Sequence, residues 1–136
     1  MQSVCSLLPL EFATQIVDAR AALSEDPTIG AIYDPPFAHF THQLAEEYDW
    51  DGLSAALAEF AARAKPFAAR TVGLLSFSGE QSYGVLAAVH RSPELLAYHE
   101  ALWELITPFA QGSVVSFYES KNLVPHVTIK RSDASN

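Results

Sequence analysis

The sequence predicts an α+β fold in one domain, residues 1–136, built from two copies of one unit. The pattern His-x-Thr occurs twice, as His39-Phe40-Thr41 and as His126-Val127-Thr128, each inside a short apolar run. The segments around both patterns follow the same order of strand, helix and His-x-Thr strand, which indicates an internal duplication. We therefore expect two lobes, related by a pseudo-two-fold axis, whose antiparallel sheets and flanking helices surround a central cleft.

The first copy covers about residues 3–77. Its helices are predicted from apolar residues that recur every three or four positions, and its strands from short apolar runs that end at turn residues. Asp34-Pro35-Pro36 favours an extended entry into the first His-x-Thr strand. The expected elements are a strand at 3–10, a helix at 11–23, a loop at 28–36, the strand around His39, an acidic turn at 46–51, a helix at 53–64 and a strand at 67–77.

The second copy covers about residues 83–131. Ser92 and Pro93 predict a helix start, because serine caps helix N-termini and proline fits the first helical position. The expected elements are a strand at 83–89, a helix from 93 to about 108, a strand at 114–118 and the His-x-Thr strand at 124–130.

No helix and strand follow the second His-x-Thr strand, so we expect the second lobe to be truncated. The back face formed by Val127 and Ile129 should then be less covered than the face around Phe40. Because an uncovered strand edge invites pairing with another chain, a homodimer or a longer natural chain would supply the cover.

The composition excludes several classes of function. The net charge is −8 and the pI is about 4.9, whereas an extended nucleic-acid or anionic membrane surface needs clustered Lys and Arg. A small anionic ligand is still allowed. The single cysteine, Cys5, excludes an internal disulfide and a zinc-binding spacing, so we expect the cytoplasm. We expect no signal peptide, because the first residues lack Lys and Arg and their apolar stretch ends at Glu11. The sequence shows no membrane-spanning run, metal motif or triphosphate-binding motif, and no cofactor is expected.

Each His-x-Thr pattern predicts half of an acid–base site. Alternate side chains of a strand share a face, so His39 should lie beside Thr41, and His126 beside Thr128 and Lys130. Because the pKa of a free imidazole is about 6.5, one of two histidines can be neutral while the other is charged at working pH. Two such halves brought together would make a whole site.

The segment Phe117-Tyr118, followed by Val124-Pro125-His126-Val127-Thr128-Ile129, resembles the two-histidine (2H) phosphoesterase superfamily, also called the 2′-5′ RNA ligase-like family. The first copy is similar to the same pattern, and the resemblance covers about residues 3–131. It implies a bilobed α+β fold and a metal-independent phosphodiesterase acting on 2′,3′-cyclic phosphates or 2′-5′ linkages of nucleotides. The sequence departs from the family in two ways. His42 stands where the family usually has an aliphatic residue, and the family usually continues for a helix and strands beyond the second motif.

On this interpretation His39 and His126 are the acid and the base, in an order that stays open, and both motif threonines donate to phosphate oxygens. Lys130 is either a phosphate contact or a solvated charge at the end of its strand. Three aromatic residues that flank the motif strands either stack on a nucleobase or pack in the core, namely Tyr33, Phe37 and Tyr118. We interpret His42 as a core or interface histidine, and His90 and His99 as structural.

Two other functions stay open. The same residues would serve ligation or 2′-5′ cleavage of RNA ends, although the acidic composition opposes binding of an RNA chain. The early end of the chain and the unusual His42 favour a non-catalytic nucleotide-binding module instead. The natural substrate, the choice of a 2′- or 3′-phosphate product and the oligomeric state do not follow from the sequence.

Overall fold

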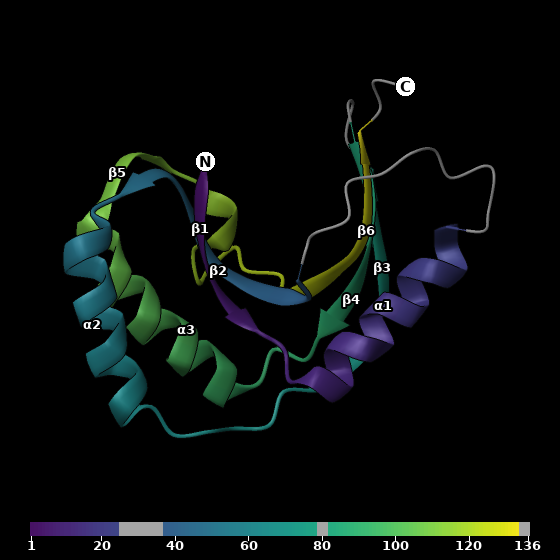
Figure 1. The fold of residues 1–136 in the computed structure, drawn as a ribbon, viewed down its shortest axis with the longest axis horizontal. Coiled ribbons are helices and arrows are strands. Elements are labelled where there is room, and N and C mark those ends of the chain that lie inside the picture. The colour runs from purple at the N-terminus through teal and green to yellow at the C-terminus, as the bar shows by residue number, and fades with distance from the viewer. Residues whose placement is uncertain (25–36, 79–81, 134–136) are drawn as a thin grey trace. The chain divides into compact units, whose positions relative to one another are not determined.

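In the computed structural model, which describes residues 1–24, 37–78 and 82–133, the chain has an α+β fold with an antiparallel sheet and three α-helices (Figure 1). The elements in chain order are β1 (Gln2–Leu7), α1 (Leu10–Ser24), β2 (His39–Tyr48), α2 (Trp50–Arg63), β3 (Thr71–Ser78), β4 (Ser82–Val89), α3 (Pro93–Ile106), the 3-10 helix η1 (Thr107–Phe109), β5 (Ala110–Val114), the 3-10 helix η2 (Ser116–Tyr118) and β6 (His126–Asp133). The hydrogen-bonded order of the strands is β1-β2-β6-β4-β3, and β5 pairs with β2.

The chain divides into two compact units, and each unit draws segments from both predicted copies. Unit 1 consists of Met1–Cys5, Thr41–Arg70 and His90–Val124, and unit 2 consists of Ser6–Phe40, Thr71–Val89 and Pro125–Asn136. The order of helices and strands along the chain is the predicted one. The duplication itself stays a prediction, because similar order alone does not establish it.

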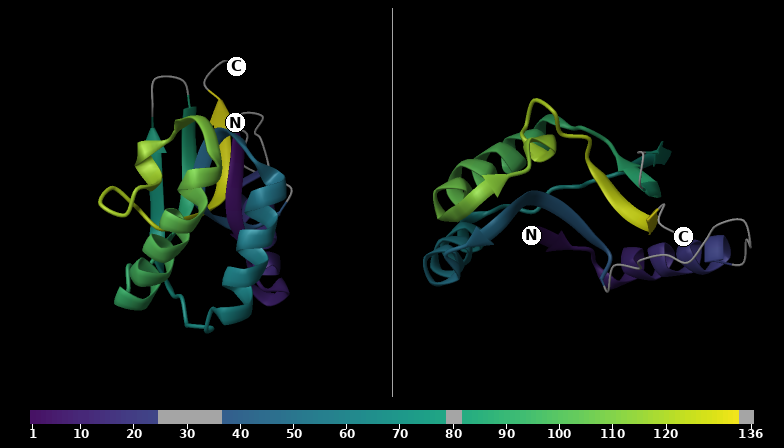
Figure 2. Two further views of the ribbon diagram at one scale, coloured as in Figure 1. Left: turned by 90° about the vertical axis from the view of Figure 1, so that its left-hand side faces the viewer. Right: turned by 90° about the horizontal axis from the view of Figure 1, so that it is seen from above.

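Unit 2 contains an antiparallel layer of β3, β4 and β6, which run beside one another (Figure 2). The first residues of β2 join this layer, because Phe40 pairs with Val127 of β6. Helix α1 packs against β6, and the Nε atom of Arg20 donates a hydrogen bond to the carbonyl oxygen of Ile129 at 2.8 Å. The second His-x-Thr strand therefore has a neighbouring strand on each side and a helix packed on it.

The back face of β6 is buried by the chain's own residues. Val127 and Ile129 are each 3% exposed, compared with 7% for Phe40. The prediction that this face is less covered than its counterpart is therefore wrong. The prediction of a homodimer depended on an exposed face at Val127 and Ile129, so the burial of these residues removes its support.

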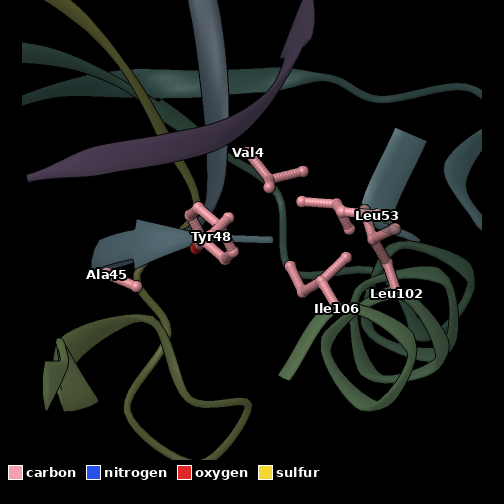
Figure 3. Packing of buried hydrophobic residues seen from close by; sticks show 6 residues of the cluster. All are labelled: Val4, Ala45, Tyr48, Leu53, Leu102 and Ile106. Carbon is pink, nitrogen blue, oxygen red and sulfur yellow. The ribbon is translucent and has the colours of Figure 1, made fainter. Parts of the chain in front are cut away.

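Unit 1 is built around a cluster of buried side chains from β1, β2, α2 and α3 (Figure 3). Helices α2 and α3 pack against each other, and β2 pairs with β5. The buried cluster consists of Val4, Ala45, Tyr48, Leu53, Leu102 and Ile106. No helix in the described ranges is both long and apolar enough to cross a membrane.

Helix α3 begins at the capping residue that the sequence predicts, and helix α2 follows an aspartate cap. The Oγ atom of Ser92 accepts a hydrogen bond from the backbone N–H of Leu95 at 3.2 Å, and Pro93 lies in the first turn. The carboxylate of Asp49 accepts from the backbone N–H of Gly52 at 3.4 Å. Both caps satisfy amide groups that have no partner inside the helix.

Three predicted elements have different limits in the structure. Residues 67–70 precede β3, strand β2 runs through the first half of the predicted acidic turn, and the predicted strand at 114–118 is replaced by β5 and η2. These limits follow strand pairing, since β3 begins where Thr71 pairs with Val89 and β2 continues alongside β5. The predicted loop at 28–36 lies outside the described residues.

Candidate active site

Strand β2 presents its motif residues on alternate faces. His39 and Thr41 are partly exposed, whereas Phe40 and His42 are buried. This is the period of two that the sequence predicts for a strand with one buried face. The first imidazole and the first threonine therefore share the more exposed face of β2.

The register between β2 and β6 brings the two histidines onto one face of unit 2. Phe40 pairs with Val127 in antiparallel orientation, so His39 is opposite Thr128 and His126 is on the diagonal. Side chains directly opposite one another have Cβ atoms about 5 Å apart, and diagonal neighbours about 7–8 Å apart. Both distances are within the reach of an imidazole that acts on one bound phosphate. This register is the central observation at the site.

Strand β4 supports β6 from its other edge. Ala88 pairs with His126 and Leu86 pairs with Thr128, and both apolar residues are buried. His126 and Thr128 are only partly exposed, and they alternate with the buried Val127. The second motif therefore lies on an inner strand, whose backbone is held by hydrogen bonds on both sides.

A backbone carbonyl fixes the orientation of His39. Its Nδ1 atom lies 2.7 Å from the carbonyl oxygen of Phe37. Because a carbonyl oxygen only accepts hydrogen bonds, Nδ1 carries the proton of this bond. The Nε2 atom is then the nitrogen that takes up or releases a proton, as a base in the neutral ring and as an acid in the charged ring. The sequence could not show this contact, because it involves a main-chain group.

The two motif threonines have different surroundings. The Oγ1 atom of Thr41 lies 3.9 Å from the sulfur of Cys5, within unit 1, and either atom could be the donor. Cys5 also donates to the hydroxyl of Ser3 at 3.2 Å. Thr128 belongs to unit 2, opposite His39 in the register. Because Cys5 donates its single S–H proton to Ser3, the Thr41 hydroxyl is the donor in its contact with the sulfur, and it must turn away from Cys5 to donate to a phosphate oxygen.

Strict alternation does not continue from Thr128 to Lys130. The register between β4 and β6 shifts there, because Leu86 pairs with Thr128 but the adjacent Val85 pairs with Lys130. Ile129 is therefore an extra residue, as in a β-bulge. The expectation that Lys130 shares the face of His126 and Thr128 relied on unbroken alternation and is wrong on this register. Lys130 is also buried, so it is not the solvated charge that was the other interpretation.

The three predicted aromatic residues have different positions. The side chain of Phe37 is largely exposed. Tyr118 ends η2 in unit 1 and is half-buried, with its ring edge-to-face against Phe117 at 5.2 Å between centroids. Tyr33 lies outside the described residues. Phe117, which is 45% exposed, is a candidate that the site prediction missed, although it stands next to Tyr118 in the sequence.

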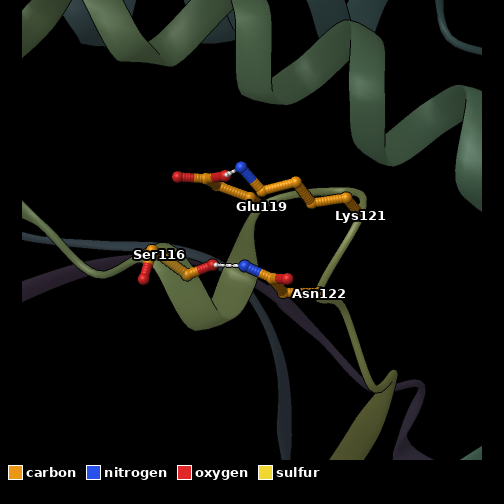
Figure 4. Close-up of polar contacts among 4 residues, drawn as sticks. All are labelled: Ser116, Glu119, Lys121 and Asn122. Atoms are coloured by element: carbon orange, nitrogen blue, oxygen red, sulfur yellow. Dashed lines mark hydrogen bonds and ion pairs between the residues drawn. The ribbon is translucent and has the colours of Figure 1, made fainter.

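The segment that contains η2 is tied together by its own polar groups (Figure 4). Asn122 donates from Nδ2 to the carbonyl oxygen of Ser116 at 2.9 Å, and Lys121 forms an ion pair with Glu119 at 2.7 Å. The backbone N–H of Leu123 donates to the carbonyl of Glu119 at 2.9 Å. These contacts fold residues 116–123 into a compact connection that leads into β6.

His42 and His99 form a buried pair in unit 1, which agrees with the interpretation of His42 as a core or interface histidine and of His99 as structural. Their Nδ1 atoms lie 3.4 Å apart, and Nε2 of His99 lies 2.7 Å from the carbonyl oxygen of Tyr118. Burial, followed by the neighbouring His99, lowers the pKa of His42 to about 3. Burial also lowers the pKa of His99, against the opposing effects of the Tyr118 carbonyl and Glu100. Both rings are therefore neutral at neutral pH.

Within the described ranges, no group of three or more His, Cys, Asp or Glu side chains is arranged to hold a metal ion. In unit 2, strands β2 and β6 offer the imidazoles of His39 and His126 and the hydroxyl of Thr128 on paired strands. Groups of this kind move protons and donate hydrogen bonds to an oxyanion.

A comparison with known protein families identifies the family of this chain. The model of the 2′-5′ RNA ligase superfamily matches the chain over residues 8–136, which includes both His-x-Thr strands. This match confirms the resemblance to the 2H phosphoesterase superfamily that the motifs indicate. Searches of curated proteins and of solved structures gave no match.

Proposed function

Because the chain belongs to the 2′-5′ RNA ligase superfamily, which is the 2H phosphoesterase superfamily, we propose that it is a phosphodiesterase acting on 2′,3′-cyclic phosphate or 2′-5′-linked nucleotide ends. The observation that carries the proposal is the register of β2 on β6, which puts His39 and His126 on one face. A single bound phosphorus atom could then have an imidazole on each side.

In the proposed reaction, one imidazole removes a proton from water as the water oxygen forms a bond to phosphorus. The bond from phosphorus to one ribose oxygen breaks, and the other imidazole donates a proton to that oxygen. The product is a phosphomonoester with a free ribose hydroxyl, and the pair of histidines holds one proton before and after the reaction. For His39 the nitrogen involved is Nε2, because Nδ1 donates to the Phe37 carbonyl.

The motif threonines complete the proposed site. The hydroxyls of Thr41 and Thr128 donate to the non-bridging phosphate oxygens, whose charge is redistributed in the transition state. Lys130 is not assigned a phosphate contact, because it is buried and does not share the face of His126 and Thr128 on this register. Phe37 and Tyr118 are the proposed contacts for the base, together with Tyr33.

Product analysis on adenosine 2′,3′-cyclic phosphate, in the presence of EDTA, tests the proposal with wild type, His39→Ala and His126→Ala. His90→Ala is a suitable control, because His90 is exposed and lies outside the two motifs. We expect wild type and the control to form a phosphomonoester and both motif variants to lose turnover. Chelator-sensitive turnover, or full activity in either motif variant, would contradict the two-imidazole mechanism.

Processing of RNA ends is the alternative that the family description favours. It would use the same histidines, but a longer RNA contact requires basic residues, and the net charge is −8. Binding of a transfer-RNA-half mimic, measured as a function of salt, distinguishes the two. A steep fall in affinity with salt favours an RNA substrate, whereas tight binding of the cyclic nucleotide without any product favours a non-catalytic module.

A further inference from the structure

We propose that Arg20 of helix α1 is a positioning residue that holds the β-bulge at Ile129. The bulge in turn keeps His126 and Thr128 on the same face of unit 2 as His39. All five residues belong to unit 2. The contact at the bulge is a feature of the fold, whereas its consequence for turnover rests on the proposed function. Arg20 does not touch the reacting atoms in this proposal.

The bulge joins two registers of β6 on β4. Residues 126–128 of β6 pair with residues 88–86 of β4, and residues 130–133 pair with residues 85–82. The two sets of pairs are one residue out of step with each other, and Ile129 is the extra residue between them. The strand could be paired without a bulge only if one of the two registers gave way to the other.

A shift of one residue would turn the second motif over. If the register of residues 130–133 continued toward the start of β6, Val127 would pair with Ala88 in place of His126. A slip of one residue moves every side chain of the shifted segment to the opposite face of the sheet. His126 and Thr128 would then leave the face of His39. The position of the bulge therefore decides which side chains of β6 form the candidate site.

Arg20 donates to the extra residue itself. The extra residue of a bulge is left out of the regular ladder, so its backbone groups need other partners. Nε of Arg20 donates to the carbonyl oxygen of Ile129 at 2.8 Å, between residues 109 positions apart. Ile129 is 3% exposed, so water has little access to this carbonyl and cannot readily replace the donor. The contact therefore favours the register in which Ile129 is the extra residue.

Helix α1 presents Arg20 from a position that is fixed by packing. The helix packs against β6, and Ile16 is buried one turn before Arg20. Residues four positions apart lie on the same face of a helix, so Arg20 shares the face that carries the buried Ile16. Because the guanidinium is charged, its hydrogen bond is stronger than one between neutral groups.

The test compares Arg20→Met with Arg20→Gln. Nε2 of glutamine stands at the same number of bonds from the backbone as Nε of arginine, so glutamine can donate to Ile129 from the same place. Methionine has a similar length but donates nothing. Arg63→Met is the control for the loss of a positive charge, because Arg63 lies on α2 of unit 1 with a side chain 70% exposed. Thermal unfolding confirms that the variants are folded at the assay temperature.

Cross-strand nuclear Overhauser effects report the register of β6 on β4. Wild type, Arg20→Gln and the control should show Leu86 paired with Thr128. Arg20→Met should show a population in which Leu86 pairs with Ile129, as the shifted register requires. An unchanged register in Arg20→Met, or the same shift in Arg20→Gln, would overturn the proposal.

Turnover should follow the register. We expect kcat/KM of Arg20→Met on adenosine 2′,3′-cyclic phosphate to fall roughly tenfold, as it would if about one molecule in ten kept the active register. The loss should lie mainly in KM, because a substrate that binds only the active register draws molecules back to it. Arg20→Gln should restore most of the loss. Full kcat/KM in Arg20→Met, or an equal loss in Arg63→Met, would contradict the positioning role.

The two measurements separate failure of this inference from failure of the proposed function. If wild type has no turnover, the proposed function fails, and the register of Arg20→Met alone decides whether Arg20 holds the bulge. If Arg20→Met does not fold, the comparison of Arg20→Gln with wild type decides. A wild-type register in Arg20→Gln then supports the proposal, and a shifted register overturns it.

Discussion

Acidification should destabilise this protein through His42. The side chain is 2% exposed, and burial together with His99 lowers its pKa to about 3. In the unfolded chain the pKa of a histidine is about 6.5. Between these values the unfolded state binds more protons than the folded state, so the free energy of unfolding falls as pH falls. The stabilising contribution is fully present above pH 6.5 and is lost progressively toward pH 3.

The size of the effect follows from the two pKa values. One unit of pKa corresponds to about 1.4 kcal/mol, so the whole depression represents on the order of 4–5 kcal/mol. Between pH 7.5 and pH 5.0 the same relation gives a loss of about 2 kcal/mol from His42 alone. The lowered pKa of His99 acts in the same direction.

Urea denaturation of wild type and His42→Asn at pH 7.5 and 5.0 measures this loss. The amide nitrogen of asparagine can take the place of Nδ1 and donate to His99, but the amide does not titrate. His39, His90 and His126 are present in both proteins, so their contributions cancel in the difference. The stability of wild type relative to the variant should fall by about 2 kcal/mol between the two pH values. A difference that stays constant with pH would refute the reasoning.

Three further outcomes are expected. His39→Ala and His126→Ala should each lower kcat by about 10²–10⁴-fold, and the double variant should be little worse, whereas additive losses would mean that the two imidazoles act separately. Thr128→Val should lower kcat by about 10²-fold or more with the fold intact, unless the hydroxyl serves only strand packing. Leu53 is fully buried, so Leu53→Ala should lower the free energy of unfolding by about 2–5 kcal/mol. Leu10 is 83% exposed, so Leu10→Ala should change the free energy of unfolding little. Equal losses in the two variants would contradict the assigned core.

Local features were predictable from the sequence where one segment contains all the information. The start of α3 depends on Ser92 and Pro93, which act within a single turn. The alternation of exposed and buried residues in β2 needs only the strand period. The family could also be recognised, because the two motifs are short, contiguous segments of sequence.

Features that depend on distant partners were not predictable. The β-bulge at Ile129 arises from the register of β6 on β4, and no residue near Thr128 signals it. The burial of Val127 depends on how the rest of unit 2 packs, so it could not be judged from the residues that follow β6. The sequence favours a core or interface position for His42 and a structural role for His99, but their contact joins residues 57 positions apart.

The two faces of β2 explain why the proposed acid–base role is assigned to some histidines and not to others. A general acid must carry a proton near neutral pH, and its pKa must therefore lie close to that range. His42, with its pKa lowered to about 3, holds no proton to donate there, although it is only three residues from His39 on the same strand. Burial lowers the pKa of His99 as well. The partly exposed face is left with His39, whose Nε2 is available for proton transfer, and with His126 on the neighbouring strand. The burial that makes His42 a structural residue thus selects the opposite face of the strand for the proposed chemistry.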